Sequence, residues 1–431
     1  MGLLVLLVTG ALAQEPASTN ASPPQDQATE RRGASQSGFE DVPEFGGPNS
    51  VGATLREDDA VKEATVFRFE GIQRGLKPYF DWKGRVNEKH GLAFGLDYTA
   101  LYQAASESPG KDDAGSGILR LFGTWTALGR DSGNTGSLVY KVENRHSYTD
   151  LAPQDLGFEV GYAGLTAGPY NDAGWLLTNL YWQQKFNEGR VSFIAGQVDT
   201  TDYVDVYGLV SPWLAFTNLA FSTDPTIPAP NQGLGAAVGV MATDNIYVVA
   251  GLADANGDPT DPGEGFNTFF DDREYFSHIE VGWTTSRERI YLDNVHLTAW
   301  HVDERDEARV PDGKGLAFSF ARFINEKWMP FVRAGYADDG GALWERSLST
   351  GFGYYMKKRR DLLGFGLNWS RPARESFGPG LDDQYTVEFF YRLQLSQNFA
   401  ITPDVQLLID PALNPTEDQI WIVGVRLRLA L

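Results

Sequence analysis

Charged side chains occupy alternate positions in several segments that are otherwise rich in apolar residues, as Lys141, Glu143 and Arg145 do. Guanidinium and carboxylate groups form several hydrogen bonds each, which suits solutes with neighbouring hydroxyl groups. Aromatic rings among these charges can stack on the apolar face of a sugar ring. Both signs of charge are present, whereas an anion channel would need an excess of Arg and Lys. The candidate residues for binding such a polar, neutral solute are Asp97, Arg120, Phe122, Lys141, Glu143, Arg145, Glu280, Trp300, Arg333, Glu388, Arg392 and Arg426.

Residues suited to catalysis are few and lack a recognisable arrangement. The chain has 5 His, none of them in an H-E-x-x-H sequence, and it has no G-x-S-x-G or phosphate-binding loop. The absence of Cys excludes thiolate chemistry and Cys-ligated metals. The net charge of −21 argues against a nucleic-acid partner. We therefore predict no enzyme, with a barrel hydrolase that uses His146 or His296 as the alternative.

One acidic stretch partly resembles a calcium-binding loop. Asp254, Asn256 and Asp258 stand at its first, third and fifth positions. Pro259 replaces the Gly that such a loop needs for its sharp turn, and Gly265 replaces the bidentate Glu. We expect a solvated external loop and no cofactor, with adventitious calcium at these three residues as the alternative.

The elements that carry the charges follow a period of two residues, which indicates β-strands. The first is LAFGLDYTALY, at residues 92–102, and the pattern continues to the C-terminus. There are about sixteen such segments of roughly ten residues, the length that a membrane-spanning strand needs. Short and long connections alternate between them, as in an up-and-down antiparallel barrel with tight turns at one end and long loops at the other. The fold class predicted is therefore all-β, a transmembrane barrel with lipid outside and a water-filled lumen. The alternative is a soluble sandwich.

The longest connection, residues 199–233, is more apolar than an exposed loop should be. It contains the sequence DVYGLVSPWLAFTNLAFSTDPTIPAP. Long ordered loops usually pack against something, so we expect this one to fold inward and narrow the lumen. Trp213, Phe216 and Asn218 would then lie near the luminal charges. The alternative is a packed external cap.

The N-terminal region differs from the barrel in composition. MGLLVLLVTGALAQ has the apolar run and the A-x-A pattern of a signal peptide, which we assign to residues 1–13. Residues 14–69 are rich in Ser, Pro, Gln and Gly, and we expect a flexible, low-complexity periplasmic segment. FDWKGRVNEKHG, at 80–91, fits a short helix that ends at Gly91. The barrel is assigned to residues 70–431, in the bacterial outer membrane.

Two stretches resemble the carbohydrate-selective porin (OprB) family. LAFGLDYTALY, preceded by WKGRVNEKHG, looks like its opening strand, and IPAPNQGLGAAVGVMATDNIYVVAGLADANGD, at 227–258, is similar to its central hairpin. The resemblance extends from about residue 70 to the C-terminus. It implies a sixteen-stranded, monomeric-pore barrel that passes sugars by facilitated diffusion, with charged and aromatic residues at the constriction. The chain ends at Leu431, whereas such proteins commonly end in Phe.

The function that we expect is an outer-membrane channel for sugars, with a charged, aromatic-lined constriction. The expected partners are mono- or oligosaccharides, outer-membrane lipid and the machinery that assembles barrels in that membrane. Two alternatives remain open from the sequence. One is a general diffusion porin that sieves by size without preferring sugars. The other is a secreted all-β binding protein.

Overall fold

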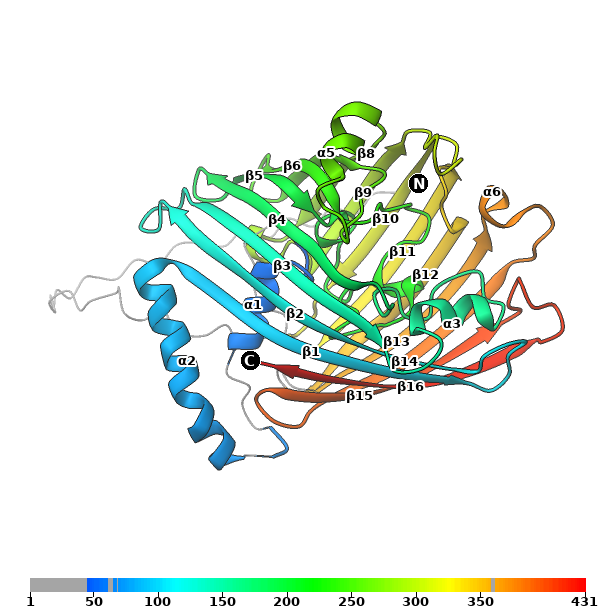
Figure 1. The fold of residues 1–431 in the computed structure, drawn as a ribbon, viewed down its shortest axis with the longest axis horizontal. Helices are drawn as coiled ribbons and strands as arrows, with labels where there is room; N and C mark the ends of the chain where they lie inside the picture. The colour runs from blue at the N-terminus through cyan, green and yellow to red at the C-terminus, as the bar shows by residue number, and fades with distance from the viewer. Residues whose placement is uncertain (1–44, 61–64, 68, 358–360) are drawn as a thin grey trace, which may run out of the picture. The chain divides into compact units, whose positions relative to one another are not determined.

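The computed structural model describes residues 45–60, 65–67, 69–357 and 361–431. The predicted signal peptide lies outside these residues. The strands form one closed ring in which each pairs antiparallel with its neighbours along the chain, and β1 pairs with β16 (Figure 1). The closed sixteen-stranded barrel that the alternation predicts is therefore confirmed. Its strands are β1 (Leu92–Ala105), β2 (Asp113–Leu128), β3 (Gly136–Ser147), β4 (Gly174–Phe186), β5 (Val191–Val198), β6 (Gly233–Met241), β7 (Ile246–Asp254), β8 (Tyr275–Thr284), β9 (Asp293–Val302), β10 (Gly313–Arg322), β11 (Trp328–Asp339), β12 (Trp344–Lys357), β13 (Asp361–Pro372), β14 (Gln384–Gln394), β15 (Phe399–Ile409) and β16 (Gln419–Ala430).

Alternation along each strand separates an apolar outer face from a polar inner one. In β14, Thr386 and Glu388 are fully buried on the inside, whereas Tyr385 and Phe389 are each 43% exposed on the outside. Successive side chains of a strand point to opposite faces of a sheet, so this pattern fixes the register in which the strands can pair. The outer wall is therefore suited to an apolar medium and the lumen to water.

The two ends of the barrel differ in their connections. Residues 187–190, 242–245 and 395–398 form short turns at one end, called here the short-turn end. The longest connections, residues 148–173 and 199–232, arise at the opposite end, called the long-loop end. The C-terminus lies at the short-turn end, on the same side as helix α2 (Figure 1).

Helices occur in the connections and in the N-terminal region, and all of them except α2 are short. They are α1 (Val51–Asp59), α2 (Glu70–His90), α3 (Pro153–Glu159), α4 (Leu219–Ser222), α5 (Gly265–Asn267) and α6 (Arg374–Phe377). Helix α2 ends where the sequence predicts, because Gly91 caps it with the positive φ of 72° that glycine tolerates best. It begins at Glu70, earlier than predicted. Among the described residues, no helix is both long and apolar enough to cross a membrane.

Part of the N-terminal region for which we predict a flexible segment is helical. Within residues 14–69, α1 is helical, and its Val51 and Leu55 are buried. Ser50 caps the helix, since its hydroxyl accepts a hydrogen bond from the Ala53 amide. The low-complexity composition of the surrounding sequence concealed this helix, which is too short to show a clear period.

Candidate functional site

Residues 199–232, which connect β5 to β6, are tied to inward-facing side chains of distant strands. Arg426 of β16 donates hydrogen bonds to the carbonyl oxygens of Pro212, at 2.5 Å, and Ala215, at 2.8 Å. Glu388 of β14 accepts from the amide nitrogens of Thr217 and Asn218, at 2.7 and 3.0 Å. We call this connection the luminal loop, since it can reach these partners only inside the barrel.

Further hydrogen bonds hold the luminal loop against strands β8 and β11. Arg333 of β11 donates to the Asp205 carboxylate and, at 2.6 Å, to the Thr223 carbonyl oxygen. Glu280 of β8 accepts from the Asp205 amide at 2.9 Å. Arginines and carboxylates on the lumen wall therefore satisfy backbone groups that a buried loop would otherwise leave unpaired.

The apolar residues of the luminal loop form a small hydrophobic core with the barrel wall. Phe216 is fully buried, with ring-centroid distances of 4.9 Å to Phe221, 5.0 Å to Phe390 and 5.8 Å to Phe331. Burial of apolar area stabilises the loop against the wall. This core explains the high apolar content of the connection.

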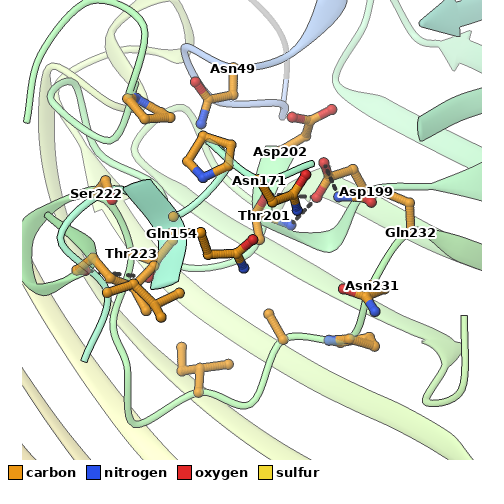
Figure 2. Close-up of a pocket in the computed structure, with 18 of the residues that line it drawn as sticks. Asn49, Gln154, Asn171, Asp199, Thr201, Asp202, Ser222, Thr223, Asn231 and Gln232 are labelled. Carbon is orange, nitrogen blue, oxygen red and sulfur yellow. Dashed lines mark hydrogen bonds between the residues drawn. The ribbon is translucent and has the colours of Figure 1, made fainter. Parts of the chain in front are cut away.

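A cavity of about 350 Å³ remains between the luminal loop and the facing wall. Strand β3 contributes Lys141, Glu143 and Arg145 to its lining, and the loop contributes Asp202 and Trp213. Figure 2 shows the polar residues around this cavity, which come from several separate segments of the chain. The labelled residues are Asn49, Gln154, Asn171, Asp199, Thr201, Asp202, Ser222, Thr223, Asn231 and Gln232.

Charges of both signs lie side by side in the lining of this cavity. Lys141 Nζ lies 3.4 Å from Asp202 Oδ2 and 4.0 Å from Asp199 Oδ2. Arg145 pairs with Glu143 on the same strand, with 2.6 Å between Nη2 and Oε2. Such a site offers hydrogen-bond donors and acceptors side by side, as a polyhydroxylated solute needs.

An aromatic residue stands beside these charges. The guanidinium of Arg120 lies 4.2 Å from the centroid of the Trp213 ring, within the range of a cation–π contact. Asp97 accepts hydrogen bonds from the same guanidinium, one of them at 2.8 Å. The Trp213 ring also packs against Tyr170, with centroids 5.7 Å apart. Arg120 thus fixes the orientation of the ring at the cavity.

One cavity carboxyl has a strongly shifted protonation equilibrium. Burial raises the pKa of Asp202 to about 7; the Lys141 ammonium opposes this shift, and the nearby Asp199 adds to it. Asn179 donates a hydrogen bond to the Asp202 carboxylate at 3.1 Å. Near neutral pH, Asp202 therefore exchanges between a neutral and a charged form.

The predicted site residues fall into three groups. Lys141, Glu143, Arg145 and Trp213 line the cavity. A second group joins the luminal loop to the barrel wall away from the cavity. Phe216 and Asn218 of the loop contact the wall residues Phe390 and Gln406. The wall residues that bind the backbone of the loop are Glu280, Arg333, Glu388, Arg392 and Arg426. The third group lies on the inner wall outside the cavity lining: Asp97 pairs with Arg120, which stacks on Trp213, Phe122 packs over Gly95, and Trp300 packs with Phe276 and Val302.

Several cavity residues are not predicted by the sequence. Asp199 and Asp202 lie in the luminal loop, for which the sequence predicts a role only for the apolar stretch. Gln154 and Asn171 belong to the β3–β4 connection, and Asn49 precedes the barrel altogether. Strand periodicity carries no information about such residues, because none of them lies on a strand.

The carboxylate oxygens of the acidic stretch that begins at Asp254 accept hydrogen bonds from residues of the same β7–β8 connection. Asp254 accepts from the Asn256 amide at 2.9 Å and from the Thr268 hydroxyl. Asp258 accepts from the Thr260 amide at 2.8 Å. Among the residues that the structure describes, no group of three or more His, Cys, Asp or Glu is placed to hold a metal ion.

A closed sixteen-stranded barrel with an apolar outer wall, a polar lumen and a loop packed inside it defines the porin class of proteins. Within that class the chain belongs to the family described as "Carbohydrate-selective porin, OprB family", which matches residues 126–431. The family resemblance of the sequence is therefore confirmed. No curated protein sequence matches the chain.

Solved structures agree with this barrel. The high-pH structure of Pseudomonas putida OprB has a TM-score of 0.67 at 14% identity, and the match covers 82% of this chain and 97% of that one. The low-pH structure of the same protein has a TM-score of 0.51 at 10% identity, with 85% and 100% covered. A mutant of the Rh. blastica porin has a TM-score of 0.50 at 13% identity, with 79% and 100% covered. At sequence identities of 10–14%, these matches show a shared fold alone.

Proposed function

We propose that the cavity between β3 and the luminal loop is the sugar-selective constriction of an outer-membrane channel. The observation that carries this proposal is the juxtaposition of Lys141, Glu143 and Arg145 with Asp202 and Trp213 around one cavity. Carboxylates accept hydrogen bonds from sugar hydroxyls, Lys and Arg donate to their oxygens, and an indole ring covers the apolar face of a pyranose. Membership of a carbohydrate-selective family supports the same substrate class.

Transport in this proposal is passive and non-catalytic. A sugar crosses the constriction by exchanging hydrogen bonds with water for hydrogen bonds with the wall. Binding must be favourable enough for entry and weak enough for release. No covalent step is needed.

The membrane in this proposal is the bacterial outer membrane. Supporting it are the apolar outer wall, with Ile279, Val281 and Leu316 each 49% exposed, and the signal-like N-terminal sequence. Outer-membrane lipid would then cover the wall. Insertion would require the assembly machinery of that membrane.

The test is the conductance of the purified protein in planar bilayers, titrated with glucose and then with a neutral amino acid. Saturable block by glucose alone is the expected result. Conductance without block by either solute would indicate a general diffusion porin instead. A protein with no conductance would contradict the channel itself.

A further inference from the structure

Residues 45–59, called here the N-terminal segment, lie inside the barrel although they precede it in sequence. At one end, Phe45 packs closely against β6: a Cβ atom added at Gly239 would lie 2.3 Å from its ring. The Gly47 amide then donates a 2.5 Å hydrogen bond to the Asp202 carbonyl oxygen of the luminal loop. The segment thus starts on the β6 wall and passes directly beneath the loop that lines the cavity.

At its other end the N-terminal segment is fixed to a different part of the wall. Asp58 accepts two hydrogen bonds from Arg428 of β16, both at 2.8 Å. Both residues are buried, Asp58 at 8% and Arg428 at 6% exposure. Leu55 lies 3.4 Å from where a Cβ would stand at Gly95 of β1. In the closed ring, β2 to β5 separate β1 from β6. Helix α1 also packs against β2 and β3, and Phe45 and Ser50 lie beside β4 and β5, so the segment runs along the inner wall from β6 to β1 and occupies space in the lumen there.

The position of the segment along the barrel axis is also defined. Gly239 and Arg428 both lie near the ends of strands that reach the short-turn end. Asn49, which lies between Phe45 and Asp58 in the sequence, lines the cavity together with Asp202 (Figure 2). A solute leaving the cavity towards the short-turn end therefore meets the N-terminal segment next.

The tie at Asp58 is part of a buried, charge-balanced group. Arg428 also donates to Asp97, at 2.5 Å, and Asp97 in turn pairs with Arg120. Two guanidinium groups and two carboxylates thus satisfy one another away from water, and removing one partner of such a group is strongly destabilising. This group ties the Asp58 end of the N-terminal segment to β16 and, through Asp97, to β1.

We propose that the N-terminal segment is a second constriction of the pore, in series with the luminal loop, and that it limits conductance and the size of solute that passes. This inference rests on the proposed channel function but not on its sugar selectivity. The segment narrows the path by its bulk, whereas the cavity above it selects by hydrogen bonding.

Deletion of residues 45–59 is the first test, measured as single-channel conductance and as liposome swelling with sugars of increasing size. The expected result is at least about twofold higher conductance and entry of larger sugars. Block by glucose should persist, because the β3 lining is intact. If the deletion variant has the higher conductance but glucose blocks neither it nor the unmodified protein, the second constriction is supported and the sugar site is contradicted. Unchanged conductance and exclusion size would overturn the second constriction.

A substitution covers the case in which the deletion variant does not assemble. The chain contains no Cys, so Asn49→Cys introduces a unique thiol in the N-terminal segment beside the cavity. A charged, bulky methanethiosulfonate reagent should lower its conductance by at least about half. Lys77→Cys is the matched control, because Lys77 lies on α2 with 70% of its side chain exposed. Complete labelling of Asn49→Cys without any loss of current would overturn the proposal.

Discussion

Several charged residues on the inner wall hold the luminal loop in place. Arg333, Glu388 and Arg426 all bind backbone groups of that loop. A buried backbone amide or carbonyl without a partner costs about 1–3 kcal/mol, so a loop packed inside a barrel needs such residues. Charge on an inner wall therefore does not by itself identify a residue that contacts the solute.

Arg145→Ala should weaken the block of the channel by glucose, since it removes a donor from the cavity. It also leaves Glu143 without the partner that lies 2.6 Å away. We expect the concentration of glucose for half-maximal block to rise about tenfold, which corresponds to about 1.4 kcal/mol. Arg322→Ala is the matched control, because Arg322 is exposed at the end of β10. Equal glucose block in both variants would remove Arg145 from the binding site.

The ion selectivity of the pore should depend on pH near neutrality. Burial raises the pKa of Asp202 to about 7, so this carboxyl is charged at pH 8 and largely neutral at pH 6. The cavity then carries one more net positive charge at pH 6, because Lys141 loses the negative charge 3.4 Å away. Cation selectivity should fall as the pH falls, as measured by reversal potential in a salt gradient. Asp202→Asn should be insensitive to pH over this range, and a slope equal to that of the unmodified protein would contradict the assignment.

At the scale of elements, the sequence predicts the strands well and the segments inside the lumen poorly. Strand alternation is a local signal, and its period is clear in strands such as β8 and β14 because one face is apolar and the other polar. The apolar stretch of the luminal loop also predicts packing. The N-terminal segment gives no such signal, since α1 has only nine residues and its anchor, Arg428, lies at the opposite end of the chain.

The candidate site likewise combines strand residues that the sequence predicts with loop residues that it does not. The three β3 residues, Lys141, Glu143 and Arg145, follow from strand parity. Their partners Asp199 and Asp202 do not, because only the path of the loop brings them to Lys141. Parity also cannot tell a wall residue that faces the cavity from one covered by the loop, as Glu388 is.

Deletion of residues 208–222 should widen the pore. It removes the hydrophobic core around Phe216 and Phe221, together with the backbone groups that Glu388 and Arg426 bind. Polymer-exclusion measurements in planar bilayers should show a larger size limit. Deletion of residues 379–381, in the exposed β13–β14 connection, is the control. An unchanged limit in the 208–222 variant would mean that this stretch does not narrow the path.

At the scale of the whole molecule, the closed ring leaves no strand edge free. β1 and β16 pair over nine residues, from Asp97 with Ala430 to Ala105 with Ile422. Closure satisfies backbone groups that lipid could not, which is why membrane-spanning sheets form barrels. A secreted sandwich would instead expose its polar face, the reverse of the arrangement seen here.

The purified protein should require detergent for solubility, and its mobility in denaturing gels should change on heating. The unheated barrel stays compact in dodecyl sulfate because its hydrogen bonds form a closed ring, so it should migrate faster than the heated chain. A tryptophan fluorescence melt in the same detergent gives an independent measure of unfolding. Solubility without detergent, with one mobility before and after heating, would favour the secreted β protein.

The bond between Asp58 and Arg428 has a consequence for the order in which the molecule is built. The two residues are among the most distant partners in the sequence, and Arg428 occupies its place only when the last strand pairs with the first. Contacts of such long sequence separation form late in folding, because the loop between them must be closed first. A half-built barrel therefore lacks the ion pair that fixes the Asp58 end of the N-terminal segment. The ion pair that fixes the N-terminal segment in the lumen therefore forms at the same step as the closure of the barrel. An assembly intermediate whose barrel is still open at the side is thus distinct from a closed barrel that lacks this segment.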